Sequence, residues 1–115
     1  MLKSLFRSRR ALALVTLTAA LLAFSSVAAL ASGSKTVQVK DNFFSAKKLT
    51  IGKGARVTWK WDAVLRHNVA VRSGPSKFRS RTQVHGTFSH TFTKAGTYHL
   101  YCTLHPYMKM TIVVR

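Results

Sequence analysis

Acidic side chains are scarce in this sequence. Asp41 and Asp62 are the only carboxylate residues among 115, against 19 lysines and arginines, and the formal net charge is +17. A surface this basic favours contact with acidic proteins, anionic membranes or cell-wall polymer, although dispersed cations are also typical of a merely solvated surface. Nucleic acid is the other usual partner of a basic chain, but the sequence has no nucleic-acid-binding motif and we expect no such partner.

Cysteine occurs once, at Cys102. An internal disulfide is therefore excluded, and we expect no lipoprotein anchor, because no cysteine directly follows the apolar run at residues 11–30. A leftover cysteine is a free reactive thiol or a metal ligand. A nucleophilic Cys/His pair would need a third orienting group and a substrate cleft, for which a domain this small has little room. We therefore do not expect an enzyme.

Helical periodicity is absent after residue 31, and the chain has no internal repeats. Short alternating runs are instead separated by Gly, Pro and Asn, a pattern typical of an all-β sandwich or barrel. The expected strands are 36–40, 48–51, 56–61, 67–72, 87–93, 96–102 and 111–114. In the run that ends at Cys102, Tyr98 and Leu100 share the cysteine's face, so we expect its sulfur to point into the domain.

The N-terminus has the pattern of an export signal. A basic segment precedes an almost wholly apolar or small run, and Ala29-Leu30-Ala31 forms an A-x-A cleavage site. We expect residues 1–31 to be a signal peptide, with an uncleaved membrane anchor as the alternative. The remaining domain, residues 32–115, has a net charge of +13 once the four basic residues of the signal are removed. We expect it in the periplasm or outside the cell.

Potential metal ligands cluster as C-x-x-H-x-x-M at Cys102, His105 and Met108. Thiolate and thioether together select copper, and two His, one Cys and a weak axial Met describe an electron-transfer copper site. Structural zinc sites use four nitrogen or sulfur ligands and no methionine. A second histidine must come from elsewhere, and His67 is the best candidate.

Met110 is a competing thioether. It is in strand phase with Ile112 and Val114, so it has a ready role as a flexible core residue. We therefore expect Met108 to be the axial ligand.

Residues 36–115 resemble the cupredoxins, the small blue copper proteins. The resemblance depends on the segments 67–69, 96–108 and 111–114, and its loop pattern is nearest to amicyanin, then to plastocyanin. It implies a Greek-key β-sandwich and one copper held by His67, Cys102, His105 and Met108. It also implies transfer of single electrons between redox partner proteins outside the cytoplasm.

The resemblance also implies supporting roles. Asn68 would place its backbone N–H near the thiolate and tie the two ligand loops together through its side chain. Electrons would pass through the exposed edge of His105, inside an apolar collar of Leu104, Pro106 and Tyr107. Tyr101 is either a more remote electron route or an ordinary strand tyrosine. We assign no metal role to the remaining histidines, which are His85, His90 and His99.

Two other functions are compatible with the same ligands. The protein could store, carry or deliver copper instead of electrons, or it could be a basic surface-binding protein whose metal is structural. We expect a monomer in each case. Reversible redox cycling supports electron transfer, whereas transfer of Cu(I) to an acceptor supports delivery.

Overall fold

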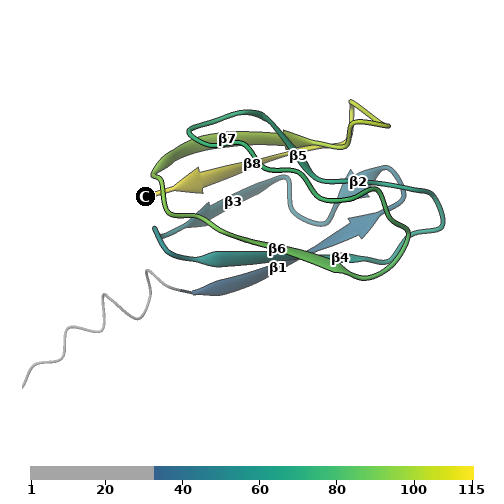
Figure 1. Ribbon diagram of the computed structural model, residues 1–115, viewed down its shortest axis with the longest axis horizontal. Helices are drawn as coiled ribbons and strands as arrows, with labels where there is room; N and C mark the ends of the chain where they lie inside the picture. The colour runs from purple at the N-terminus through teal and green to yellow at the C-terminus, as the bar shows by residue number, and fades with distance from the viewer. Residues whose placement is uncertain (1–32) are drawn as a thin grey trace, which may run out of the picture.

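The computed structural model describes residues 33–115, so the expected signal peptide lies outside the described residues. These residues form eight strands and no helix, which confirms the predicted all-β class (Figure 1). The strands are β1 (Ser34–Lys40), β2 (Phe43–Phe44), β3 (Lys48–Ile51), β4 (Arg56–Trp61), β5 (Ala70–Ser73), β6 (Thr87–Thr91), β7 (Gly96–Tyr101) and β8 (Lys109–Val114). Within this part of the chain, no helix could cross a membrane.

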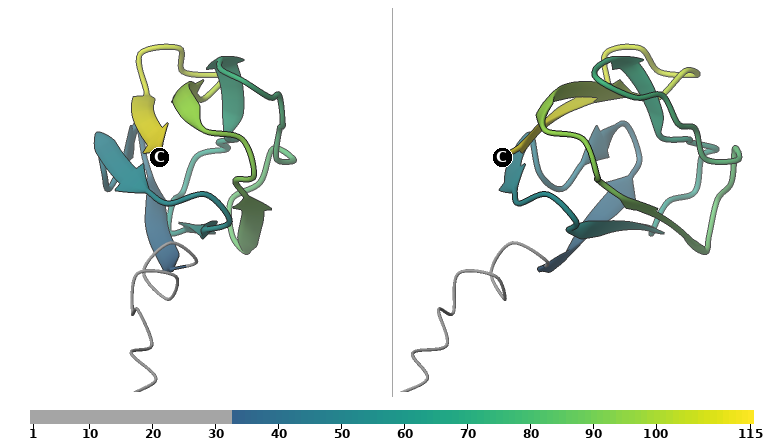
Figure 2. Two further views of the ribbon diagram at one scale, coloured as in Figure 1. Left: turned by 90° about the vertical axis from the view of Figure 1, so that its left-hand side faces the viewer. Right: turned by 60° about the vertical axis from the view of Figure 1, so that its left-hand side comes forward.

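The strands form two four-stranded sheets that face each other (Figures 1 and 2). One sheet has the order β2-β1-β4-β6 and the other β3-β8-β7-β5. The pairs β1–β4 and β3–β8 are parallel, and the other pairs are antiparallel. The chain changes sheet at every connection from β2 to β7, and non-consecutive strands such as β1 and β4 become neighbours, as in a Greek-key sandwich.

The core lies between the sheets and is rich in aromatic rings. In β4, Val57, Trp59 and Trp61 are buried, as their alternation predicts. The Trp59 ring contacts those of Phe78, Phe88 and Phe92, with centroids 5.8–6.4 Å apart. Fully burying an apolar side chain contributes about 1.5–3 kcal/mol, and both Trp59 and Phe92 are fully buried, so this cluster stabilises the sandwich.

The strand expected at 67–72 begins only at Ala70. His67 instead forms an isolated bridge with Gln83, and the next two backbone N–H groups donate to side chains, Asn68 to Cys102 Sγ and Val69 to Ser80 Oγ. Hydrogen bonds that a sheet ladder would use are thus diverted, so the segment leaves the sheet. The prediction of a strand at 67–69 was wrong for this reason.

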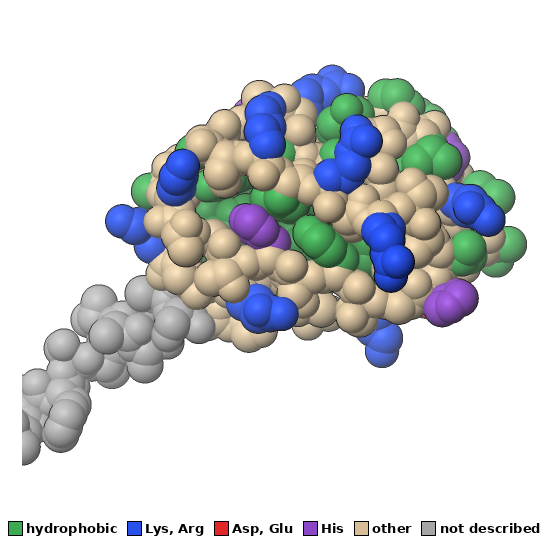
Figure 3. All heavy atoms as spheres, in the orientation of Figure 1, with side chains coloured by type: hydrophobic (Ala, Val, Ile, Leu, Met, Phe, Trp, Pro, Cys, Tyr) green, Lys and Arg blue, Asp and Glu red, His purple; other side chains and the backbone are tan. Residues whose placement is uncertain are grey.

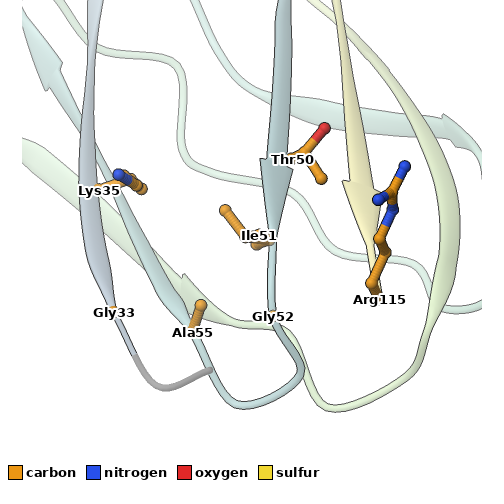
Figure 4. Close-up of a pocket in the computed structure, with 7 residues that line it drawn as sticks. All are labelled: Gly33, Lys35, Thr50, Ile51, Gly52, Ala55 and Arg115. Carbon is orange, nitrogen blue, oxygen red and sulfur yellow. The ribbon is translucent and has the colours of Figure 1, made fainter. Parts of the chain in front are cut away.

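The sandwich has two chemically different ends. His67 follows the end of β4, and residues 102–108 connect β7 to β8 at the same end (Figures 1 and 2). At the other end of these strands, a hollow of about 330 Å³ is lined by Gly33, Lys35, Thr50, Ile51, Gly52, Ala55 and Arg115 (Figure 4). A six-residue strand spans about 20 Å, so this hollow is remote from the predicted ligands.

Candidate metal centre

Three of the predicted ligands converge at one end of the sandwich. His67 Nδ1 lies 3.1 Å from His105 Nδ1, and these two atoms lie 3.9 Å and 3.7 Å from Cys102 Sγ. The residues come from two separate connections, and 35 positions separate His67 from Cys102. Within residues 33–115, this is the sole grouping of three His, Cys, Asp or Glu side chains suited to a metal ion.

The spacing of these three atoms fits one metal ion. A triangle with sides of 3.1, 3.7 and 3.9 Å has a circumradius of about 2.1 Å, within the range of about 2.0–2.3 Å typical of metal–nitrogen and metal–sulfur bonds in proteins. A single ion could therefore bind all three atoms without rearrangement of the side chains. Two imidazoles and one thiolate in a trigonal set are the donors of a blue copper site.

Backbone hydrogen bonds hold the loop of residues 102–108 closed. Cys102 N donates to Met108 O at 3.0 Å, Met108 N donates to His105 O at 2.8 Å, and His105 N donates to Cys102 O at 3.2 Å. Cys102 and Met108 are buried, whereas His105 is partly exposed. The predicted orientation of Cys102 is confirmed, and the loop presents a histidine edge to solvent above a buried sulfur.

His67 is fixed through its backbone and its ring. Its N–H and C=O both bond Gln83, at 3.1 Å and 3.0 Å, and Trp61 Nε1 also donates to His67 O at 3.1 Å. The side chain is fully buried. Because the Nδ1 edge of the ring meets His105 and Cys102, little freedom is left for His67 to turn away from the centre.

Asn68 makes the contacts expected of it. Its backbone N–H points at Cys102 Sγ from 3.5 Å. Its side chain donates from Nδ2 to Thr103 Oγ1 and accepts at Oδ1 from Thr103 N, both at 2.8 Å. The two loops that carry the candidate ligands are therefore joined next to the sulfur.

Asp41 belongs to the centre, although the sequence reasoning gave it no role there. Its carboxylate lies 2.9 Å from His67 Nε2 and accepts hydrogen bonds from the backbone of Val64 and Leu65. The hydrogen bond with His67, followed by the two backbone bonds, lowers the pKa of Asp41 to about 2. The one signal in the sequence that could have pointed to Asp41 is the scarcity of acidic residues, since the chain has only two.

The two candidate axial methionines have different surroundings. Met110 Sδ accepts a hydrogen bond from Trp59 Nε1 at 3.5 Å, inside the core. Met108 is also buried, but it lies in the connection that carries Cys102 and His105 and bonds to both through its backbone. The predicted burial of Met110 in phase with Ile112 is confirmed.

The other three histidines lie outside the cluster. His90 is half-buried and stacks on Phe78, with ring centroids 3.9 Å apart, and its burial lowers its pKa. His85 and His99 are exposed. Tyr101 is half-buried beneath Arg72, whose guanidinium carbon lies 4.6 Å from the ring centroid.

Comparison with known proteins identifies the family. Residues 31–115 match the family model of the copper-binding proteins of the plastocyanin/azurin family. The chain belongs to this family. The curated relatives include amicyanin-alpha of Methylorubrum extorquens, 37% identical over 84% of this chain and 93% of its own length. Amicyanin of Paracoccus denitrificans is 31% identical over 77% of this chain and 71% of its own.

Solved structures similar to this cupredoxin include an amicyanin and a copper-containing nitrite reductase. A reduced mutant of amicyanin superposes with a TM-score of 0.65 at 30% identity, covering 76% of this chain and 88% of that one. A copper-containing nitrite reductase from Thermus scotoductus gives a TM-score of 0.62 at 36% identity, but the match covers 71% of this chain and only 22% of the enzyme. The likeness to the enzyme is thus confined to a minor part of it.

The family and the three converging donor atoms establish the cofactor. This cupredoxin binds copper, one ion per chain. Its trigonal His₂Cys donor set is that of a type 1 copper site.

Proposed function

We propose that this protein carries single electrons between redox partners through copper held by His67 Nδ1, Cys102 Sγ, His105 Nδ1 and Met108 Sδ. The observation that supports it most is the mutual spacing of the first three atoms, which lie 3.1–3.9 Å apart. Bound copper would supply the one-electron chemistry by alternating between Cu(I) and Cu(II). The protein's part is to keep the same ligand positions in both states.

Rigidity of the ligand loops supports this role. The Asn68–Thr103 hydrogen bonds join the loops, and the backbone bonds of the 102–108 connection fix Cys102 against Met108. Ligands that cannot move far make the geometries for Cu(I) and Cu(II) similar, which lowers the reorganisation needed for each transfer. The Asn68 N–H near Cys102 Sγ would also tune the reduction potential, since hydrogen bonds to a ligand sulfur do so.

The choice of Met108 as axial ligand is supported by elimination. Met110 Sδ already accepts the Trp59 indole N–H, so recruiting it would leave a buried donor without its partner. Met108 lies in the short loop that closes on Cys102. A weak thioether contact at this position is what the type 1 donor set needs.

A docking surface surrounds the exposed edge of His105. Residues 33–115 expose five large hydrophobic side chains, and all lie on connections or a short strand at the metal end, namely Phe43, Val64, Leu65, Leu104 and Tyr107. The Tyr107 ring is 6.0 Å from that of His105. We propose that a redox partner buries this apolar surface and that electrons pass through the His105 edge.

The charge of the domain suggests the kind of partner. Lysine and arginine side chains are spread over the face seen in Figure 3, and no acidic side chain is visible there. We propose a redox protein with an acidic surface as the partner, since complementary charge accelerates encounter. Contact with an anionic membrane or cell-wall surface is a further proposal from the same charge.

We propose export to the periplasm or cell exterior, with residues 32–115 acting as a monomer.

The experiment is to express residues 32–115, add Cu(II) and record the visible spectrum. A thiolate-to-copper charge-transfer band is expected, and Cys102→Ser should abolish it while the circular dichroism of the β-sandwich persists. Fast electron self-exchange with retention of copper would support the carrier role. Full colour in the serine variant would overturn the ligand assignment, and ready transfer of Cu(I) to a metal-free acceptor would favour delivery.

A further inference from the structure

Asp41 contacts the buried ligand His67 from a different part of the fold. Its Oδ1 is 2.9 Å from His67 Nε2 and accepts the Leu65 N–H at 2.9 Å, while Oδ2 accepts the Val64 N–H at 3.0 Å. Asp41 lies in the turn between β1 and β2, 26 positions before the histidine. The carboxylate therefore joins that turn, the connection after β4 and the imidazole ring.

The two nitrogens of His67 face opposite chemical partners. Nδ1 faces His105 Nδ1 and Cys102 Sγ, whereas Nε2 faces the carboxylate. An ionised carboxylate only accepts hydrogen bonds, so the proton of a neutral imidazole must be on Nε2. Nδ1 is then left with a free lone pair directed at His105 Nδ1 and Cys102 Sγ, the other two atoms that would bind the metal. A carboxylate behind a ligating histidine also raises its basicity.

We propose that Asp41 is the positioning residue of the copper centre: it selects the Nε2–H tautomer of His67, fixes the ring plane and holds a negative charge behind the ligand. This inference rests on the proposed role of His67 as a ligand. It assigns a function to a residue outside the proposed ligand set.

The local backbone is built to aim this carboxylate. The register pairs Lys40 with Phe43, so Asp41 and Asn42 form a two-residue turn. Asn42 has φ of 72°, a left-handed conformation that asparagine tolerates better than most residues. The turn brings Asp41 to the backbone of residues 64 and 65, and their two N–H groups orient both oxygens.

The charge of Asp41 is not matched by a nearby cationic side chain of the described residues. The other carboxylate, Asp62, pairs with Lys40, whereas the only ion-pair partner of Asp41 in residues 33–115 is His67 itself. The negative charge therefore acts on the imidazole and, through it, on the metal. Cu(II) carries one more positive charge than Cu(I), so Asp41 should favour the oxidised state and lower the reduction potential.

The first test uses the metal-free protein and measures the ¹⁵N chemical shifts of His67 by NMR. The wild type should show the Nε2–H tautomer, and Asp41→Ala should show a mixture of both tautomers. Asp62→Ala is the matched control, because it removes the other carboxylate without touching His67, and it should retain the wild-type tautomer. An unchanged His67 tautomer in Asp41→Ala would overturn the positioning role.

The second test measures Cu(II) affinity and reduction potential. Loss of a partner that orients a ligand costs about 10–100-fold in metal affinity, so Asp41→Ala should bind Cu(II) that much more weakly than Asp62→Ala. Asp41→Asn keeps an acceptor oxygen for Nε2–H but loses the charge, so its potential should rise more than that of Asp62→Asn. Equal shifts in the two asparagine variants, or equal affinities in the two alanine variants, would refute the proposal.

The electron-carrier function and the positioning role of Asp41 can be disproved separately. If the wild type gave no blue copper band, the proposed electron-carrier function would fall. The tautomer of His67 in the metal-free protein would still decide whether Asp41 positions the ring. Circular dichroism of each variant shows whether the sandwich is intact, and Asp41→Asn provides the milder change if Asp41→Ala unfolds.

Discussion

Asn68 and Thr103 are joined by a reciprocal pair of hydrogen bonds, each of 2.8 Å, between the two loops that supply the copper ligands. The side-chain amide of Asn68 bonds Thr103 twice, once at its backbone N–H and once at its hydroxyl, and the two bonds close a ring. Directly beside it, the Asn68 N–H meets Cys102 Sγ. The relative position of the two loops and the surroundings of Cys102 Sγ therefore both depend on Asn68.

Asn68→Ala should lower the free energy of unfolding of the metal-free protein by about 1–3 kcal/mol, because it leaves partly buried polar groups of Thr103 without partners. Chemical denaturation measures this change, and the Cu(II) EPR spectrum should also alter as the loops separate. Thr103→Ser is the control, since it retains both hydrogen-bonding groups. Wild-type stability and spectrum in Asn68→Ala would contradict this account.

The methionine assignment is tested by two single variants. Met108→Gln should lower the reduction potential and change the Cu(II) spectrum, because a harder amide oxygen favours Cu(II). Met110→Leu should leave the spectrum unchanged but cost about 1–3 kcal/mol of stability, since Trp59 Nε1 loses its acceptor. The reverse pattern, with a spectral change only in Met110→Leu, would make Met110 the axial ligand.

Electron transfer with an acidic cytochrome should slow as salt is added. The domain of residues 32–115 has a net charge of +13, and exposed charges are screened over about 8 Å at physiological ionic strength. Stopped-flow measurement of the bimolecular rate across a salt series tests this, with a basic cytochrome as the control. A rate that does not change with salt would mean that the charge serves another contact, such as adhesion to an anionic surface.

His90 should make the metal-free fold less stable in mildly acidic solution. Burial lowers the pKa of His90 from its ordinary 6.5, so below pH 6.5 the unfolded chain binds a proton that the folded chain resists. Stability therefore rises with pH through this window and falls as pH decreases. Denaturation at several pH values should show a shallower dependence in His90→Phe, which keeps the stack on Phe78, than in the wild type. His85→Gln, an exposed control, should retain the wild-type slope.

Local patterns were enough to predict most of the strands, although not β2, and to bring Cys102 and His105 together. Alternation predicted the burial of Trp59 and Cys102, and the C-x-x-H-x-x-M spacing placed His105 beside the sulfur. In each case the informative residues are neighbours in one strand or one short loop. His67 was chosen because a type 1 copper site needs a second histidine, and the resemblance to the cupredoxins then supported that choice.

Long-range hydrogen bonds were not predictable from these patterns. Asp41 reaches His67 only because the sandwich brings the turn after β1 beside the connection after β4. Similarly, the Trp59–Met110 contact joins facing strands that are 51 positions apart. The late start of the strand expected at 67–72 has the same cause, because the N–H groups of Asn68 and Val69 bond side chains from elsewhere in the fold.

The hollow of Figure 4 has a practical consequence for attaching this protein to a surface. Gly33 and Arg115, the first and last described residues, both line it, at the end of the strands away from His105. A linker or tag fused at either position would leave the apolar docking surface around His105 free. The domain immobilised in this way on an electrode would point its histidine edge toward the solution, so soluble partners could exchange electrons with it while it stays tethered.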